Sequence, residues 1–254
     1  MTDDDRGHGP GDGPGAGYEQ VWLDDFRSGR NTDWWSAYHG DPKGLAGTAR
    51  WNRANLVADP SGTGSLRFET TIGPDGVVES AGTSSARALD AVPALRRPYG
   101  TWGFRYRVDA DDGSVGHVVL LYRKGGGWPP EIDVVEDGGG DRQSVAATIH
   151  WRDPRLPPAR QHQQRRLGVL RADFTTWQTV WLTLGPRLVR VEVAGQSVEW
   201  DGVRANGVDD SALVFPSEPL WLGVQTHRKR GTPVPATLPT LEVDWVGKWV
   251  PRAP

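Results

Sequence analysis

Three carboxylates stand within six positions of one another in the stretch "GWPPEIDVVED", which covers residues 127–137. They are Glu131, Asp133 and Glu136, and the residues between them are the Ile and Val of a buried β-strand. Two carboxyl groups on one surface can hydrolyse a glycosidic bond with retention, because one protonates the leaving oxygen while the other attacks the sugar carbon. A carboxylate between them can support the nucleophile and raise the pKa of the acid.

The spacing of the three carboxylates conflicts with the alternation of a regular strand. Glu131 and Asp133 are two residues apart and share a face, whereas Glu136 lies three residues beyond Asp133 and would point the other way. One inserted residue, a β-bulge at Val134 or Val135, returns Glu136 to the face of the other two. A polar rim on an exposed sheet face is the alternative interpretation, and spacing alone does not choose between them.

Short β-rich segments, separated by glycine and proline, must position this motif. Apolar and polar residues alternate in "GSLRFETTI", "WQTVWLTLG" and "LVRVEVAG", and helical periodicity is nearly absent apart from a possible turn at residues 211–215. Strands without intervening helices predict two packed antiparallel sheets. We expect one β-sandwich domain over residues 18–254, preceded by a disordered Gly/Pro/Asp-rich tail at residues 1–17.

The motif and its flanks resemble glycoside hydrolase family 16. "EIDVVE" is similar to the bulged Glu-x-Asp-x-x-Glu signature of its laminarinase-like and agarase-like members, and "GWPP" before it and "TIHW" after it also look like that family. "LDDF", "YGTWGFRYRV" and "LEVDWVGKWV" are similar to other family segments, in the family's order, so the resemblance covers residues 18–250. It implies an all-β, concanavalin A-like jelly-roll sandwich of two antiparallel sheets with a concave substrate cleft.

The resemblance also implies functions for individual residues. Carried over by position, Glu131 is the nucleophile, Asp133 its supporting residue and Glu136 the general acid/base. Further positions match residues of the family's sugar cleft, namely His150, Trp128, Trp102 and Arg87. Structural alternatives remain open for these four, because a lone histidine often satisfies a core hydrogen bond, tryptophan often packs in a core, and a strand arginine is often solvated.

Three features depart from the family pattern. "HVVLLYRK" has Leu120, Leu121 and Tyr122 where members usually carry a tryptophan-bearing strand, so we expect a cleft platform to be missing. Gly103 stands where a glutamate is usual. The sequence as given lacks the basic and apolar regions of a secretory signal, which predicts a cytoplasmic protein unless a leader was removed, although family members are usually secreted.

Composition restricts cofactors and partners. The chain has no cysteine and no His-x-x-x-His motif, so we expect no catalytic metal or cofactor; Asp244 matches a position where the family often carries a structural calcium. A net charge of −3 argues against nucleic acid, and no apolar run approaches the roughly 20 residues of a membrane span. Two basic stretches, "RQHQQRR" and "HRKRG", are interpreted as solvated loops, and His227 in the second could line a cleft end.

These observations give one leading hypothesis and two alternatives. We expect a monomeric retaining endo-β-glycanase that cleaves a polysaccharide or oligosaccharide, with β-1,3-glucan as the expected substrate, by double displacement. The expected loss of a cleft platform instead favours a non-catalytic glycan-binding sandwich. An intracellular enzyme acting on a less polar metabolite would have Leu, Val and Tyr around Glu131, whereas exposed tryptophans and polar groups there would count against it.

Overall fold

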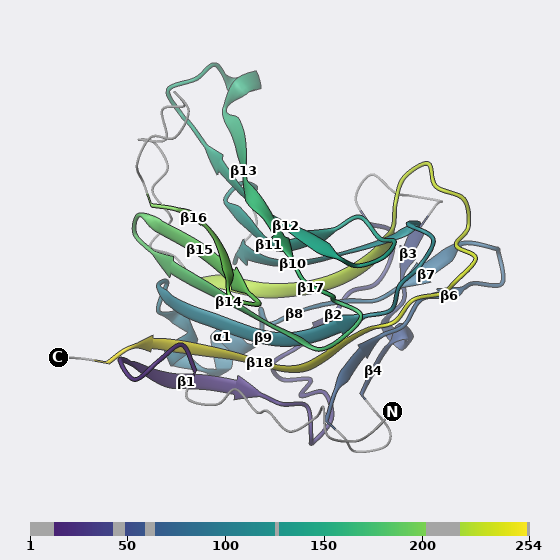
Figure 1. Ribbon diagram of the computed structural model, residues 1–254, viewed down its shortest axis with the longest axis horizontal. Coiled ribbons are helices and arrows are strands. Elements are labelled where there is room, and N and C mark those ends of the chain that lie inside the picture. Colours follow the sequence, from purple (N-terminus) through teal and green to yellow (C-terminus); the bar gives the residue numbers. More distant parts are fainter. Residues whose placement is uncertain (1–12, 43–48, 59–63, 125–126, 202–218, 253–254) are drawn as a thin grey trace.

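The computed structural model describes residues 13–42, 49–58, 64–124, 127–201 and 219–252. Two antiparallel sheets lie face to face across one hydrophobic core (Figure 1). The expected all-β sandwich of two antiparallel sheets is therefore confirmed. No helix in these ranges is long and apolar enough to cross a membrane.

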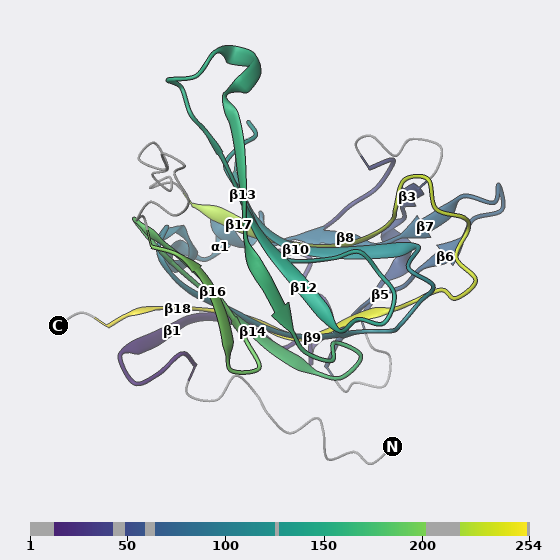
Figure 2. The same cartoon turned by 45° about the horizontal axis from the view of Figure 1, so that its top comes forward.

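The carboxylate motif lies on β11, an inner strand of the first sheet, which we call the cleft sheet. Its order is β13-β12-β11-β10-β17-β8-β2. The strands are β2 Ser36–Ala37, β8 Gly82–Ser84, β10 Val115–Arg123, β11 Glu131–Asp137, β12 Ser144–Arg152, β13 His162–Arg171 and β17 Leu220–Arg228. The connection from β12 to β13, which contains the 3-10 helix η4 Pro158–Arg160, extends away from the body of the sandwich in both Figure 1 and Figure 2.

The second sheet forms the other layer, in the order β16-β15-β14-β9-β18-β5-β4, with β1 paired to β18. Its strands are β1 Tyr18–Asp24, β4 Leu56–Ala58, β5 Leu66–Phe68, β9 Gly100–Val108, β14 Gln178–Gly185, β15 Leu188–Val193, β16 Gln196–Trp200 and β18 Leu241–Pro251. A small third sheet contains β3 Ala49–Trp51, β6 Thr71–Ile72 and β7 Val78–Ser80. The short helices are η2 Arg53–Asn55, α1 Ala88–Ala91 and η3 Pro93–Arg96.

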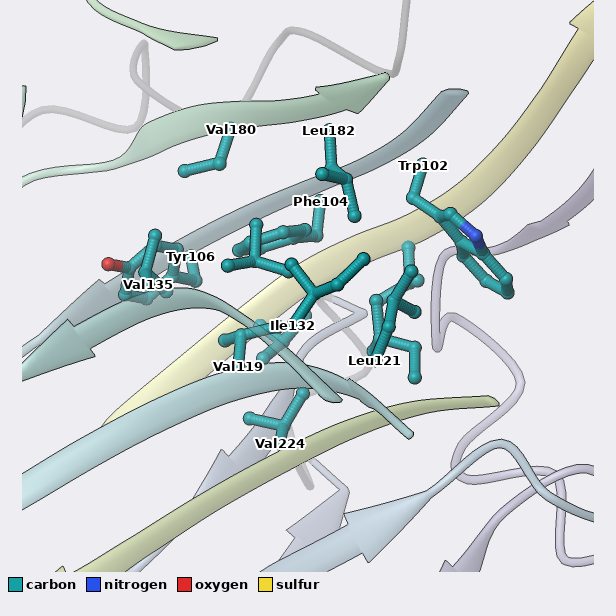
Figure 3. Close-up of a cluster of buried hydrophobic side chains, with 14 of the residues drawn as sticks. Trp102, Phe104, Tyr106, Val119, Leu121, Ile132, Val135, Val180, Leu182 and Val224 are labelled. Atoms are coloured by element: carbon teal, nitrogen blue, oxygen red, sulfur yellow. The ribbon is translucent and has the colours of Figure 1, made fainter. Parts of the chain in front are cut away.

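The core forms because alternate residues of each strand point between the sheets. From the cleft sheet come Val119, Leu121 and Ile132, and from the second sheet come Phe104 and Leu182, each at most 1% exposed (Figure 3). Burying an aliphatic or aromatic side chain of this size contributes about 1.5–3 kcal/mol. The same alternation leaves the opposite faces of β10 and β11 free for the cleft.

The structure describes part of the expected N-terminal tail. Residues 1–12 lie outside the described ranges, and so does the turn expected at residues 211–215. Residues 13–17 form turns, in which the Tyr18 N–H donates to the Gly15 carbonyl at 3.1 Å. The Arg252 N–H donates to the Gly17 carbonyl at 2.9 Å, which ties this segment to the end of the chain.

Candidate active site

A β-bulge brings the three carboxylates to one face of β11. In the pairing with β10, Val119 is opposite Val135 and Leu120 is opposite Asp133, so Val134 is the extra residue. The pairing with β12 is irregular between Asp133 and Glu136 as well. Glu131, Asp133 and Glu136 consequently line one cavity of about 600 Å³, and the bulge expected from their spacing is confirmed.

His150 contacts the central carboxylate of the motif. It is opposite Glu131 in the β11–β12 pair, and its Nε2 lies 2.9 Å from Asp133 Oδ2. Burial lowers the pKa of His150, but the hydrogen bond to Asp133 and the charge of that carboxylate outweigh burial, so the pKa is raised overall. A protonated His150 would offset the charge of Asp133 between the two glutamates.

Both glutamates bind protons more tightly than an exposed glutamate. Burial, followed by the charge of Asp133, raises the pKa of Glu131 to about 7. The pKa of Glu136 is also raised by burial and by Asp133, although the Thr148 hydroxyl donates to Glu136 Oε2 at 2.8 Å and opposes the shift. A carboxyl that keeps its proton near neutral pH can act as a general acid.

Trp128 and His162 connect Glu131 with His150 through a chain of contacts. The Trp128 indole N–H donates to Glu131 Oε2, and its ring centroid lies 4.0 Å from that of His162. The His162 ring stacks on His150 at an interplanar angle of 15°, with His162 Nε2 3.1 Å from His150 Nδ1. Sequence reasoning missed His162, which lies at the start of β13, directly after the projecting connection (Figure 2).

A second cavity of about 540 Å³ adjoins the first and is mainly aromatic. The two share Leu120, Glu131 and Gln225. The aromatic residues that line the second cavity are Tyr38, Trp51, Tyr122, Trp128 and Trp221. Such rings can stack on the apolar faces of sugars. The strand before the motif, β10, has no tryptophan, as expected, but the cleft does not lack aromatic rings: Trp221 on β17, Tyr122 on β10 and Trp51 on β3 supply them, together with Tyr38 and Trp128.

Two glycines make room for this aromatic wall. A Cβ at Gly223 would lie 2.8 Å from the Trp221 ring and 3.1 Å from the Tyr38 hydroxyl. A Cβ at Gly82 would lie 3.0 Å from Tyr38 Cε2. Real Cβ contacts are rarely this short, so the rings lie against the backbone of β8 and β17 only because these positions have no side chain.

Two of the expected cleft residues lie elsewhere. Trp102 is 1% exposed in the core, with the Lys248 ammonium 5.0 Å from its ring centroid, so the expectation that it stacks on sugar is wrong. Arg87 is exposed, donates to the Thr32 carbonyl at 2.8 Å and lines neither cavity, so the structure does not bring it to the cleft. By contrast, Trp128 is 48% exposed beside Glu131.

The departure at Gly103 also lies away from the cleft. Gly103 is on β9 in the second sheet, and a Cβ there would lie 2.7 Å from the Trp181 ring. Trp181 fills the space that a longer side chain would need. The substitution therefore concerns packing of the second sheet and leaves the carboxylate face unchanged.

Two places bear on metal binding. Asp244 accepts a 2.6 Å hydrogen bond from Arg105, whose guanidinium supplies the positive charge there, so these residues do not fit a calcium site. Within the described ranges, the one group of three possible ligands is Glu131, Asp133 and His150, whose ligand atoms all lie within 4.8 Å of one another. Two of them belong to the carboxylate motif, and the third is the imidazole that contacts Asp133.

Comparison with known proteins gives similarity of fold without similarity of sequence. No family model matches the sequence, and no curated protein matches it. The endo-β-1,3-glucanase of Pyrococcus furiosus is 17% identical with a TM-score of 0.69, over 93% of this chain and 96% of that one.

Two further solved structures are similar over nearly all of both chains. One is a mutant of SCLam, a non-specific endo-β-1,3(4)-glucanase from family GH16 that presents 1,3-β-D-cellobiosyl-glucose at its active site; it is 18% identical, with a TM-score of 0.69, over 91% of this chain and 94% of that one. The other belongs to work on endo-acting O-glycanases of human gut microbiota that initiate mucin breakdown; it is 16% identical, with a TM-score of 0.69, over 94% and 92%. The chain therefore has the fold of the glycoside hydrolase family 16 endo-glycanases.

Proposed function

We propose that the protein is a retaining endo-glycanase that hydrolyses internal β-glycosidic bonds of a polysaccharide. The observation that carries the proposal is the bulge at Val134, which places Glu131, Asp133 and Glu136 in one cavity. An irregular strand that collects like charges is costly unless the charges are used or neutralised. The raised pKa values of both glutamates and the His150 contact to Asp133 fit such a use.

The reaction follows from two carboxyl groups of opposite protonation. One carboxylate attacks the anomeric carbon while the other carboxyl group protonates the glycosidic oxygen, which leaves with that proton. The second carboxylate then takes a proton from water, whose oxygen displaces the first carboxylate and restores the starting configuration. By resemblance to the family, Glu131 is the nucleophile and Glu136 the acid/base.

The raised pKa of Glu131 bears on which of the two glutamates is the nucleophile and which is the acid/base. A nucleophile must be ionised, yet burial and Asp133 raise the pKa of Glu131 to about 7. The Trp128 N–H and the charge of His150 act in the opposite direction and favour the carboxylate. A substrate held against Trp128 would keep this hydrogen bond in place and exclude water from around it.

Azide rescue of two alanine variants distinguishes the two functions. With an activated aryl β-glycoside of laminaribiose, Glu131→Ala should be inactive until azide is added, and the product should be the α-glycosyl azide. Glu136→Ala should still be able to form the intermediate, because the leaving group needs no proton, and azide should give the β-glycosyl azide. Reversed products would exchange the functions of Glu131 and Glu136, and full activity of both variants would contradict the proposal.

For the substrate we propose a β-1,3-linked glucan. The aromatic rings of the cavity beside Glu131 can stack on successive sugar rings of a glycan chain. Proteins of this fold include endo-β-1,3-glucanases. The test is a panel of β-1,3-glucan, mixed-linkage glucan, galactan and mucin O-glycans, with reducing ends measured over time. Preferential release of internal fragments from β-1,3-glucan is the expected result.

The alternatives have lost their supporting features. The glycan-binding hypothesis depended on a missing platform, but five aromatic residues line the second cavity. The metabolite hypothesis required Leu, Val and Tyr around Glu131, whereas Trp51, Trp221 and Gln225 are also there. Oligosaccharide binding by calorimetry without any cleavage by the wild-type protein would nevertheless favour a binding module.

A further inference from the structure

Two basic segments far apart in sequence meet at the Glu136 end of the cleft. Arg166 belongs to "RQHQQRR", and Lys229 follows β17 in "HRKRG". Both line the 600 Å³ cavity that contains the carboxylates. Arg166 is opposite Thr148 in the β12–β13 pair, so it shares the face from which Thr148 donates to Glu136. Its charge also acts to lower the pKa of Glu136, which reflects how near it lies.

Lys229 lies on the same face of the sheet but approaches Glu136 from the β17 side, whereas Arg166 approaches it from the β13 side. A Cβ at Gly116 would lie 3.8 Å from Lys229 Cγ, and a Cβ at Gly138 would lie 3.7 Å from Lys229 Nζ. The lysine stem therefore runs over β10, and its ammonium lies above the residue that follows β11. This position is two residues beyond Glu136 along the chain.

Within the part of the chain that the structure describes, neither cation has an ion-pair partner. Among the described residues, Arg166 and the Lys229 ammonium make no ion pair and no side-chain hydrogen bond, unlike Lys124, which pairs with Asp90. The neighbouring carboxylate of Asp137 lies 3.2 Å from the buried guanidinium of Arg142. Asp133 is held by His150, and the raised pKa of Glu136 reduces its negative charge. Arg166 acts on Glu136 through its charge, but the hydrogen bonds of the motif are made by other groups: His150 with Asp133 and Thr148 with Glu136.

His227 adds an unsatisfied polar atom to the same cavity. It lies two residues before Lys229, lines the cavity with it, and its buried Nδ1 has no hydrogen-bond partner among the described residues. A buried polar atom without a partner costs about 1–3 kcal/mol. A ligand oxygen at this end of the cleft could accept from it and recover that cost.

We propose that the Glu136 end of the cleft is a subsite for an anionic group, a carboxylate or sulfate ester carried by the sugar chain. Arg166 and Lys229 would bind the anionic oxygens through charge-assisted hydrogen bonds, with His227 as a third contact. The other cavity has no Lys or Arg in its lining, so the charge is confined to one end. This inference rests on the proposed glycanase function and deepens it, because it adds a preference for glycan chains that carry an anionic group next to the bond that is cleaved.

Binding to an inactive variant tests the subsite. In a Glu131→Gln background, calorimetry would compare oligosaccharides of laminarin and of agarose in neutral, carboxymethylated and sulfated forms. Binding is the readout because loss of Arg166 would also change the pKa of Glu136 and hence the rate. We expect an anionic form to bind about tenfold more tightly than its neutral form, with a preference that weakens as salt is added. The carboxymethylated and sulfated arms identify which anion the subsite takes.

Matched charge-neutral variants attribute this preference to the two cations. Arg166→Gln and Lys229→Gln should each remove most of the preference and leave binding of the neutral form unchanged. Arg171→Gln on the same strand and Arg230→Gln beside Lys229 remove equal charges from exposed positions outside the cavity lining and should change neither. Equal binding of neutral and anionic forms, or equal losses in all four variants, would overturn the inference.

The outcomes separate this inference from the proposed function. Cleavage of neutral glucan by the wild-type protein, with no effect of Arg166→Gln or Lys229→Gln on the anionic preference, would refute the subsite and leave the glycanase intact. An anionic preference that depends on both residues, without cleavage of any substrate, would support the subsite and refute the glycanase. If none of the oligosaccharides binds, in the neutral or in either anionic form, the result would count against both the subsite and the glycanase.

Discussion

His150 Nε2 lies 2.9 Å from Asp133 Oδ2, which links the imidazole to the central carboxylate of the motif. Since a carboxylate only accepts, the imidazole N–H must donate in this contact. The opposite ring atom, Nδ1, lies 3.1 Å from His162 Nε2. Burial and the neighbouring His150 lower the pKa of His162, while Asp133 keeps that of His150 raised. A proton shared by the two rings therefore resides on His150, and a neutral His162 accepts from it.

The first prediction concerns this second histidine. His162→Leu removes the acceptor for His150 Nδ1, while His162→Gln keeps an acceptor oxygen on a side chain of similar reach. We expect kcat for glucan hydrolysis to fall about threefold to tenfold in the leucine variant, with KM nearly unchanged, because the hydrogen bond orients a group beside the reacting carboxyls.

The glutamine variant provides the control for His162. It should restore most of kcat, which a purely steric function would not require. Equal losses in the leucine and glutamine variants would mean that His162 acts through its ring contact with Trp128 alone. Steady-state kinetics on one polysaccharide substrate at a fixed pH suffice to decide this.

The second prediction concerns the hydroxyl group beside Glu136, the proposed acid/base. Thr148 donates to Glu136 Oε2 at 2.8 Å and thereby opposes the increase in its pKa. Thr148→Val removes the donor at nearly constant shape, so the pKa of Glu136 should rise and the alkaline limb of the kcat/KM profile should move to higher pH. Thr148→Ser retains the hydroxyl and should leave the limb in place. An unchanged profile in the valine variant would argue that Glu136 is not the group that must be protonated.

The strands and the bulge could be predicted because they follow from local sequence. Alternation fixes which residues share a face, and the three-residue step between Asp133 and Glu136 violates alternation by one position. The same rule would have placed Trp102 correctly. It shares its strand face with Phe104 and Tyr106, so it belongs to an apolar face that points into the core. Apolar neighbours two residues away indicate core packing more strongly than family position does.

The aromatic cavity could not be predicted in the same way. Trp221 shares its strand face with Gln225 and His227, which indicates that this face is open, but nothing local places Trp51 or Tyr38 beside it. Tyr38 arrives through the pairing of β17 with β8 and of β8 with β2, and Trp51 through its bridge to Gly40. His162 is likewise brought to His150 by strand register, 12 residues later in the chain. Long-range register is set by the whole fold, so one sequence does not reveal it.

The third prediction uses the glycine beneath the aromatic wall. In Gly223→Ala the new Cβ would lie 2.8 Å from the Trp221 ring, which must move into the cavity. We expect KM for β-glucan to rise about fivefold to tenfold while kcat changes less than twofold, because the platform lies beside the carboxylates without carrying a proton. Gly185→Ala is the matched control, since its Cβ meets only Leu188 Cβ at 3.4 Å in the other sheet. A fall in kcat alone would mean that Trp221 also positions the reacting bond.

The fourth prediction tests whether the motif is an active site or a polar rim by its effect on stability. The folded protein raises the pKa of Glu131 from 4.5 to about 7, so between these values the folded chain binds more protons than the unfolded chain. Stability contributed by this group therefore falls as pH rises through that window and stays low above it. Glu131→Gln does not titrate, so we expect it to be about 1–3 kcal/mol more stable than the wild type above pH 7, with little difference below pH 4.5.

Urea unfolding at several pH values measures this difference, with Glu199→Gln as the control for the same substitution at an exposed position on β16. A gain in Glu131→Gln that is independent of pH would contradict the raised pKa. A gain confined to high pH would mean that the chain sacrifices stability to hold a buried carboxylate beside Asp133. Carboxylates on an exposed polar rim are solvated and would not reduce stability in this way. A site that must keep one proton between two glutamates requires such a buried carboxyl group.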